Sequence, residues 1–561
     1  MNRMVDMTTT DPITLEVVRN KVDGIANEMQ STLLRSSFST VVKEGLDASA
    51  SLFTPDGETL AQAIAIPIHL ATFIPIVETI TRTFPPDEMK PGDLYIMNDP
   101  YLGGTHLPDI AIVMPVFFNE KVIAFSAAMT HHQDVGGMSP GSVPPNATEI
   151  YQEGIRIPPL KLREGNEFNH TLVEMLKLNV RVPQVFMGDI GAQSSACTVG
   201  ARRVSELADR YGYGQTLQIF NELLDRSELL TRKALEAIPD GTYSYVDYLD
   251  NDGVNLDESV RIQVAVTLRG SELHCDFEGT DPQTRGPFNA VQSGSQAAAY
   301  YAVRAVTDSS IPTNGGCFRP VSLHLPEGTL VNPVEPAPVN SRTATLKRIA
   351  GSIVGALKGA LPDKIPADSA GELLVLSLGG KNLSGKPYVV GEFNAGGSGG
   401  GPRKDGVDVI ETDGSNCMNM PVEALELEAP ARVHRMSLRR DSGGVGEYRG
   451  GLGCVREIEF LTDNIALTHR GERHRHAARG SRNGGDGAKA FSKIVRQDGS
   501  EEVVHSKLFT VVHSGERLIV ETAGGGGYGN PHERDRQSVQ EDVRNRKVSE
   551  ESAKKDYGLV I

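Results

Sequence analysis

The chain has 561 residues and a formal net charge of −16. This acidity argues against a general nucleic-acid binder, which would need a basic face. The five cysteines lie far apart without a C-x-x-C pair, and no run of about 18 apolar residues occurs. The sequence therefore predicts a cytoplasmic protein with reduced thiols, no membrane segment and no nucleic-acid partner.

The N-terminal part is predicted to alternate helices and strands. Residues 1–10 are expected to be a disordered leader, after which Asp11 can cap a helix that Pro12 opens. We expect strands at 47–53, 93–97, 110–117 and 121–128, with helices at 70–83, 170–180 and 203–237. Asn119-Glu120 would make the tight connection between the last two strands.

Beyond residue 240 the pattern changes. Alternating segments predict strands at 242–250, 258–268 and 271–278, and apolar stretches predict helices at 287–307 and 343–360. From about 370 to 525 the chain is strand-like and rich in glycine. The predicted fold class is α+β (mixed α/β), with an N-terminal α/β region at 11–240, an α+β region at 241–370, a β-rich, Gly-rich region at 371–530 and a charged helical tail at 531–561.

Imidazoles and carboxylates gather in loops that follow two neighbouring predicted strands. His106 and Asp109 lie three residues apart in THLPD, and His131 begins HHQDVGG. Asp47, at the start of another strand-like segment, can supply a further oxygen. Neutral imidazole and carboxylate ligands suit Zn²⁺ or Mn²⁺. The same side chains also fit a structural role, in which the histidines form loop hydrogen bonds and the acids cap turns.

Three further motifs carry weaker signals. The cluster from His469 to His476 could bind an anion or a metal, but is more typical of a solvated basic loop. GGSGGG matches G-x-S-x-G around Ser398, yet Pro402 opposes the helix that this motif needs. No G-x-x-x-x-G-K-[ST] segment occurs, so the chain is predicted to have no ATP site of its own.

A series of segments runs in order from about residue 11 to 558. They include KEGLDASASLF, GDLYIMNDPYLGGTHLPDI, THHQDVGG, EIYQEGIRIPPLKL, RVPQVFMGDIGAQSSA and AGGGGYGNPHERD. Together they resemble the hydantoinase B/5-oxoprolinase family. The resemblance implies a B-type subunit in a hetero-oligomer with an A-type subunit that uses ATP to activate a carbonyl. Family reactions include opening of 5-oxoproline, N-methylhydantoin and caprolactam rings.

The resemblance also implies a metal site. In similar proteins a divalent ion is held by an Asp, an H-x-x-D pair and a later His, and these roles fall here on Asp47, His106, Asp109 and His131. One departure concerns the region after residue 470, where HAARGSRNGGDG replaces the Pro-Pro-Trp-Gly-Leu block of many relatives. This leaves the substrate and the partner contacts open.

Four residues near the metal ligands are candidates for chemistry. We expect His132 or Asp134 to shuttle a proton or orient a ligand, and Glu153 to act as an acid or base. Arg156 could hold a phosphate or carboxylate. The predicted function is metal-assisted hydrolysis of a cyclic amide activated by ATP on the partner. Two alternatives stay open, a subunit of an acetone/acetophenone-type carboxylase and a non-catalytic scaffold for the A-type subunit.

Overall fold

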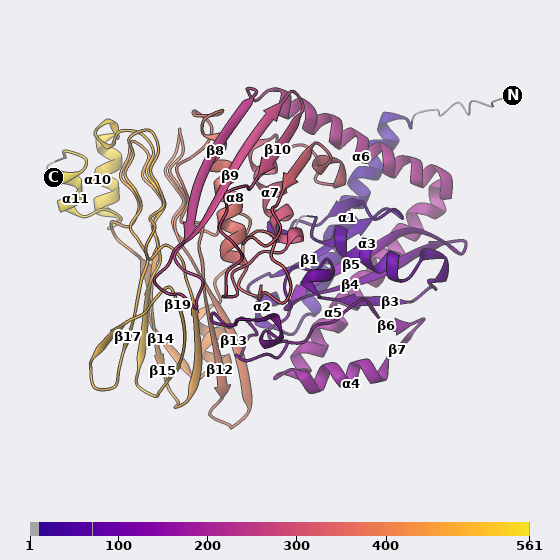
Figure 1. The fold of residues 1–561 in the computed structure, drawn as a ribbon, viewed down its shortest axis with the longest axis horizontal. Helices are drawn as coiled ribbons and strands as arrows, with labels where there is room; N and C mark the ends of the chain where they lie inside the picture. The colour runs from indigo at the N-terminus through magenta and orange to yellow at the C-terminus, as the bar shows by residue number, and fades with distance from the viewer. Residues whose placement is uncertain (1–9, 70, 560–561) are drawn as a thin grey trace.

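The computed structural model describes residues 10–69 and 71–559, so the predicted leader lies outside the described residues except for Thr10. The molecule is elongated, with the N-terminal α/β part at one end and two short C-terminal helices at the other (Figure 1). Several sheets combine with many helices. This confirms the predicted mixed α/β fold class.

The first sheet has antiparallel strands in the order β2-β1-β5-β4-β3-β6-β7. Its strands are β1 (Ala48–Phe53), β2 (Thr59–Gln62), β3 (Leu94–Met97), β4 (Asp109–Phe118), β5 (Lys121–His131), β6 (Leu160–Glu164) and β7 (Glu167–Phe168). Asn119 and Glu120 connect β4 to β5 with φ values of 46° and 66°. Positive φ at both residues is what a two-residue hairpin turn with the right twist requires.

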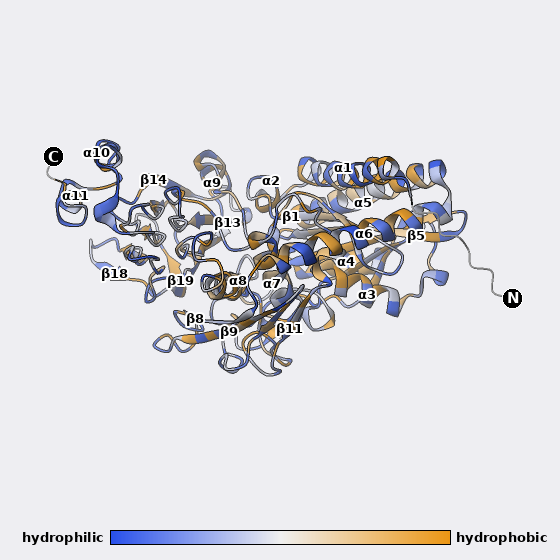
Figure 2. Cartoon of the chain, turned by 90° about the horizontal axis from the view of Figure 1, so that it is seen from above, coloured by the Kyte–Doolittle hydropathy of each residue, from blue (hydrophilic) through white to orange (hydrophobic). Residues whose placement is uncertain are grey.

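Helices cover both faces of this sheet (Figure 2). α1 (Pro12–Ser36) and α5 (Pro183–Tyr211) pack on one face and α3 (Phe73–Thr83) on the other, and α2 (Thr40–Lys43), α4 (His170–Asn179) and α6 (Tyr213–Glu236) complete this part. The Asp11 carboxylate accepts the N–H groups of Ile13 and Thr14, so the predicted cap of α1 is confirmed.

One predicted helix is wrong in its bounds. The segment expected as one helix at 203–237 is divided between two helices. α5 begins earlier, at Pro183, and ends before Gly212, and α6 begins after it. Gly212 has a φ of 77°, which breaks the helical hydrogen bonding before α6 begins. Only glycine adopts this conformation readily, so Gly212 is the residue at which the helix ends.

The second sheet has the order β11-β10-β9-β8 and begins at residue 241. Its strands are β8 (Gly241–Leu249), β9 (Val260–Arg269), β10 (Glu272–Asp276) and β11 (Val321–His324). Alternate residues of β9 are buried, as expected of a sheet with one covered face. That face carries α8 (Thr343–Leu357), which packs in turn on α7 (Gln292–Val306).

The C-terminal part is a sandwich of two sheets that share an apolar core. One sheet contains β13 (Pro387–Ala395), β12 (Leu373–Lys381), β16 (Ile465–Arg470) and β19 (Lys507–Val512). The other contains β14 (Ala431–Leu438), β15 (Cys454–Phe460), β20 (Arg517–Glu521), β17 (Phe491–Val495) and β18 (Glu501–Val503). α9 (Val422–Glu428) packs beside it, and the tail forms α10 (Arg536–Arg544) and α11 (Glu550–Lys555).

All five cysteines are buried and unpaired, in keeping with the expectation of reduced thiols. Within residues 10–69 and 71–559, no helix combines the length and the apolar character that crossing a membrane requires.

The glycine-rich segments of the C-terminal part pack directly against one another. Gly451 donates its N–H to the carbonyl of Ser398, and Gly525 donates to the carbonyl of Gly451. A Cβ atom built on Gly397 would lie 1.9 Å from the Gly451 carbonyl oxygen. The glycines therefore let backbones approach at distances that any side chain would block. Ser398 lies in this packing, where its hydroxyl accepts the N–H of Val407 at 2.7 Å.

Gly397→Ala is expected to destabilise the protein, by about 1–3 kcal/mol or more, because the added methyl meets rigid backbone. Gly401→Ala is the matched control in the same glycine run, since the nearest atom to its added methyl lies 3.8 Å away. Urea unfolding of both variants measures the difference. Equal midpoints for the two variants would contradict the close packing.

Candidate active site

A pocket lies between the first sheet and the β12–β16 side of the C-terminal sandwich. Its empty volume is about 410 Å³. Its charged and imidazole side chains belong to Asp47, His69, His106, Asp109, His131, Arg342 and Arg470, and Thr343, Ser415 and Cys417 also line it. Apolar side chains from β12, β13 and the segment 66–68 complete it. The structure thus brings the four predicted metal ligands to one pocket.

The register of the first sheet explains this convergence. Asp109, the first residue of β4, is paired with His131, the last residue of β5. The N–H of His131 donates to the carbonyl of Asp47, which directly precedes β1. His106 lies in the loop before β4, and its Nε2 is 3.2 Å from Oδ1 of Asp109. The rings of His106 and His131 face each other edge-on, 5.0 Å apart between centroids.

The hydrogen bonding of His106 fixes its tautomer. Its Nδ1 lies 2.9 Å from the carbonyl oxygen of Asn340, which can only accept a hydrogen bond, so Nδ1 carries the hydrogen. Burial and the nearby Arg342 lower the pKa of His106, which favours the neutral ring. Nε2 then presents a lone pair toward the Asp109 carboxylate and has no hydrogen-bond partner. Two facing acceptors are satisfied by a cation between them.

The two carboxylates differ in charge state. Burial and the neighbouring Asp109 raise the pKa of Asp47 to about 8. Burial also opposes ionisation of Asp109, but His106 and Arg342 outweigh it and hold the pKa of Asp109 well below its usual range. Arg342 contacts Oδ2 of Asp109, and the hydroxyl of Thr105 donates to the same oxygen at 2.6 Å. Asp109 is therefore an anchored carboxylate, whereas Asp47 is protonated when no further cation is present.

A third imidazole, His69, was not predicted from the sequence. It ends the short 3-10 helix Pro67–His69, and its Nε2 lies 3.8 Å from both Oδ1 of Asp47 and Oδ2 of Asp109. Its Nδ1 is 2.8 Å from the hydroxyl of Ser49. Burial lowers the pKa of His69 to about 4, so the ring is neutral and can act as a ligand.

The chemistry of these donors fits a divalent ion, although their positions are wider than in a formed metal site. Neutral imidazoles and carboxylates suit Zn²⁺ or Mn²⁺, and Nδ1 of His131 is a second buried nitrogen without a partner. Over the described ranges 10–69 and 71–559, no group of three or more His, Cys, Asp or Glu is close enough to hold a metal as it stands. The predicted metal site therefore stays a prediction, and ligand distances of about 2.0–2.2 Å would require the side chains to close in.

Comparison with known proteins assigns the family. Residues 11–531 match the family Hydantoinase B/oxoprolinase. The chain belongs to this family. It is 35% identical to the beta chain of the caprolactamase of Pseudomonas jessenii, over 99% of this chain and 97% of that one. It is 33% identical to the B-type chain of a putative D-/L-hydantoinase of Pseudomonas sp. strain NS671, over 99% and 96%. The 5-oxoprolinase 1 of Arabidopsis thaliana is 30% identical over 93% of this chain, which covers 42% of that longer protein.

Solved structures agree with this assignment. The crystal structure of the ATP-dependent caprolactamase from Pseudomonas jessenii has a TM-score of 0.93 at 33% identity, with 99% of this chain and 97% of that chain covered. An acetone carboxylase structure has a TM-score of 0.90 at 19% identity, over 98% and 80%, which shows a shared fold. The hydantoinase B fold therefore extends over essentially the whole chain.

In this hydantoinase B chain, His132 lies on the other side of the first sheet from His131. Its Nε2 is 3.1 Å from Oε1 of Gln193, and its ring packs on Phe186, both from α5. Successive residues of a strand point to opposite faces, so a ligand role for His131 directs His132 away from the pocket. The acid/base role predicted for His132 stays a prediction that this placement does not favour.

The carboxylates of Asp134 and Glu153 are engaged with backbone. Asp134 accepts the N–H groups of Gly136 at 3.0 Å and Gly141 at 3.2 Å, and pairs with Arg181 at 2.9 Å. Glu153 accepts the N–H groups of Val339 and Asn340, both at 2.8 Å. Burial raises the pKa of Glu153 to about 8, although these two N–H groups lower it. Neither carboxylate lines the pocket.

Arg156 is likewise held outside the pocket. Its guanidinium pairs with Asp99 at 2.8 Å and with Glu335 at 2.6 Å. Both carboxylates compete with any incoming anion. The substrate-binding role predicted for Arg156 therefore has no support from its position. Two other arginines line the pocket: Arg342, which the sequence analysis did not select, and Arg470, which lies in the His469–His476 cluster.

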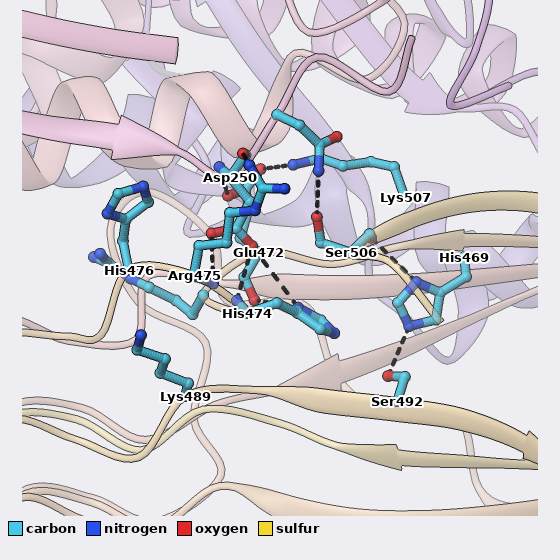
Figure 3. Close-up of polar contacts among 12 residues, drawn as sticks. Asp250, His469, Glu472, His474, Arg475, His476, Lys489, Ser492, Ser506 and Lys507 are labelled. Atoms are coloured by element: carbon cyan, nitrogen blue, oxygen red, sulfur yellow. Dashed lines mark hydrogen bonds and ion pairs between the residues drawn. The ribbon is translucent and has the colours of Figure 1, made fainter. Parts of the chain in front are cut away.

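The second histidine cluster is not a solvated loop. His469 is fully buried, and both ring nitrogens have partners (Figure 3). Its Nδ1 lies 3.1 Å from the carbonyl oxygen of Ser506, and its Nε2 lies 2.9 Å from the hydroxyl of Ser492. Burial lowers the pKa of His469 to about 3. This imidazole is a structural part of the sandwich core.

The residues that follow His469 join the second sheet to the sandwich. Asp250, just after β8, accepts the backbone N–H groups of His474 at 2.8 Å and Arg475 at 3.0 Å. Glu472 forms an ion pair with Lys507, and both side chains are buried (Figure 3). Arg473 of this segment pairs with the buried Asp247 at 3.2 Å, so its charge is engaged within the fold.

Proposed function

We propose that this chain is the B-type subunit of an ATP-dependent, two-component cyclic-amide hydrolase. The observation that carries the proposal is the pocket, in which two carboxylates, three imidazoles and two guanidiniums converge. The match to the beta chain of a caprolactamase along nearly the full length of both chains supports the choice of reaction class. The partner would be an A-type subunit that uses ATP to activate the amide. The 5-oxoprolinase relative is more than twice as long as the part that this chain matches, so it has room for such a second component in one chain.

The chemistry follows from the stability of an amide. Resonance makes a lactam or hydantoin carbonyl a poor electrophile, and transfer of a phosphoryl group to its oxygen by the A-type subunit would make it a good one. A divalent ion held by Asp47, His106, Asp109 and His131, with His69 beside them, would supply Lewis acidity and activate water at neutral pH. The apolar side chains that complete the lining of the pocket strengthen the charge interactions inside it.

The chain's own residues hold the site in shape. Asn340 fixes His106 through its carbonyl, and its side-chain oxygen accepts the N–H of Leu107 at 3.0 Å. Glu153 in turn holds the backbone of Asn340. Glu153 is therefore a positioning residue in this proposal, one step removed from the reacting atoms. Support of this kind around a ligand keeps its orientation fixed.

Reconstitution with an A-type subunit tests the proposal. We expect a stable complex, of the kind that usually buries upwards of about 2,000 Å², and ATP-dependent opening of at least one lactam or hydantoin. The chain alone is expected to bind no ATP by calorimetry and to release no product. ATP consumption should be followed with lactams, hydantoins and ketones, each with and without bicarbonate.

The outcomes separate the alternatives. Turnover of a ketone that requires bicarbonate would replace the hydrolase with a carboxylase component. If the A-type subunit paired with the His106→Ala variant of this chain retains full turnover, this chain would be a non-catalytic scaffold. Separate elution of the two proteins at micromolar concentration would contradict the two-component proposal.

A further inference from the structure

The N-terminus of α8 opens on the same pocket. Thr343, its first residue, lines the pocket directly beside Arg342. No side chain of the described residues caps this helix, so the N–H groups of its first turn have no side-chain acceptor. The hydroxyl of Ser341, just before the helix, is buried without a hydrogen-bond partner. Free N–H groups and the helix dipole make such an end attractive to anions.

Arg470 lies across the pocket from the residues of the first sheet, at the end of β16. It is paired through its backbone with Val375 of β12 and Lys507 of β19. Among the described residues no side chain or carbonyl forms a hydrogen bond or ion pair with its guanidinium, and its Nε is buried without a partner. Burial and the proximity of Arg342 lower the pKa of Arg470 to about 10, so it remains charged at neutral pH. A partly buried guanidinium that no carboxylate contacts favours binding of an anion.

A second cavity adjoins the pocket at these residues. Its empty volume is about 320 Å³, and it shares Thr343, Leu373, Val375 and Arg470 with the first pocket. Ser341 and Ala344 also line it. The uncapped helix end and the unpaired guanidinium therefore meet where the two cavities join. Glu372 and Glu472 also line the second cavity. Burial and the nearby Asp250 raise the pKa of Glu372 well above its usual range, which favours its neutral form, and Glu472 is paired with Lys507.

The charges of the pocket define what could bind. The carboxylates of Asp47 and Asp109 formally balance the guanidiniums of Arg342 and Arg470. A divalent ion would therefore leave an excess of two positive charges, which a phosphoryl dianion matches. Arg342 is already engaged by Asp109, so Arg470 is the guanidinium that is free to bind.

We propose that Arg470 and the N-terminus of α8 form an oxyanion subsite that holds the phosphoryl group of the activated substrate. The inference rests on the proposed two-component hydrolase for the identity of the anion, but its test does not require turnover. The planar guanidinium would give two parallel hydrogen bonds to phosphoryl oxygens, and the helix N–H groups would bind a third. This places the activated carbon of the substrate toward His106, Asp109 and His131.

Calorimetric titration of the full-length chain with inorganic phosphate tests the subsite, with and without Zn²⁺. Arg470→Met should weaken phosphate binding by about 10- to 100-fold, as loss of charge-assisted hydrogen bonds does, while Arg470→Lys should retain part of it. Arg156→Met is the matched control, because Asp99 and Glu335 already occupy that guanidinium. Circular dichroism and thermal unfolding verify that each variant is folded.

Unchanged phosphate affinity in folded Arg470→Met or Arg470→Lys, or a loss in Arg156→Met instead, would overturn the proposal. Bicarbonate titrations form the second arm. Bicarbonate binding that is tighter than phosphate binding and lost in Arg470→Met would assign the subsite to a carboxylate and overturn the phosphoryl assignment. Arg470-dependent phosphate binding together with a reconstituted pair that opens no cyclic amide would retain the subsite and reject the hydrolase.

Discussion

Replacing His106 with alanine is expected to remove high-affinity Zn²⁺ or Mn²⁺ binding and to abolish turnover of the reconstituted pair. The side chain offers a buried lone pair that faces the Asp109 carboxylate at 3.2 Å. Without it, the pocket loses the imidazole nitrogen that lies 3.2 Å from Asp109, and Nε2 of His69 remains at 3.8 Å from the same carboxylate. Metal assistance is worth several kcal/mol to the transition state, so the rate should fall by at least three orders of magnitude.

Metal content by mass spectrometry, beside calorimetric titration of Zn²⁺, measures this effect. The loss of the bond from His106 to Asn340 should cost about 1 kcal/mol of stability, which leaves the protein folded. His132→Ala is the matched control, because this neighbouring imidazole packs on Phe186 behind the sheet. It should keep the metal. Wild-type metal content and activity in His106→Ala would show that the ligand assignment is wrong.

The local elements could be predicted from the sequence because they follow from periodicity and turn chemistry. Asp11 and Pro12 allowed the cap and the first turn of α1 to be predicted. The two apolar runs on either side of Asn119-Glu120 allowed the β4–β5 hairpin to be predicted. The break between α5 and α6 was missed, although Gly212 and Gly214 stand together in the segment YGYG, because glycine within an apolar repeat is tolerated in a continuous helix.

The candidate site could be predicted only where its residues follow neighbouring strands. Asp109 and His131 are adjacent because β4 and β5 form a hairpin, a local relation that sequence can express. His69, Arg342 and Arg470 arrive from three distant elements. No local pattern marks His69 or Arg342, and Arg470 was noted only as part of the His469–His476 cluster. Their positions depend on how the sandwich packs on the first sheet.

The alternation of side chains along a strand could have sharpened the choice of catalytic residues. If His131 faces the pocket from β5, then His132 must face α5, as the structure shows. Asp134, Glu153 and Arg156 were selected for their chemical type and their nearness in sequence. Their partners are backbone amides and ion pairs that only the folded chain reveals.

The ion pair of Asp109 and Arg342 is expected to make a large contribution to stability. Both side chains are buried, at 1% and 2% exposure. Asp109→Ala would leave the guanidinium buried without its counter-charge, which typically costs about 3–5 kcal/mol. A loop position at the surface would have cost only about 1 kcal/mol or less. The difference arises because the loop with His106 and the start of β4 at Asp109 are enclosed by the α8 N-terminus and the sandwich.

A double-mutant cycle isolates this pair. Arg342→Met should restore part of the stability lost in Asp109→Ala, since it removes the unpaired charge and keeps most of the buried volume. The exposed pair of Glu28 and Arg203, at 40% and 32% exposure, provides the control. Glu28→Ala should cost about 0–1 kcal/mol. Urea unfolding of Asp109→Ala, Arg342→Met and their double variant, each compared with the wild type, gives the coupling energy of the pair. Additive losses for Asp109→Ala and Arg342→Met would contradict the pairing.

The charge state of Asp47 determines how much stability the Asp109→Ala variant loses. Its carboxyl is kept protonated by burial and by repulsion from Asp109, which raises its pKa to about 8. Removal of Asp109 removes the repulsion, so Asp47 becomes more readily ionised and can partly balance Arg342. We therefore expect the loss in Asp109→Ala to lie near the lower end of the range, at about 3 kcal/mol, and to grow when Asp47→Asn is added. A double variant no less stable than Asp109→Ala alone would show that Asp47 does not compensate the arginine.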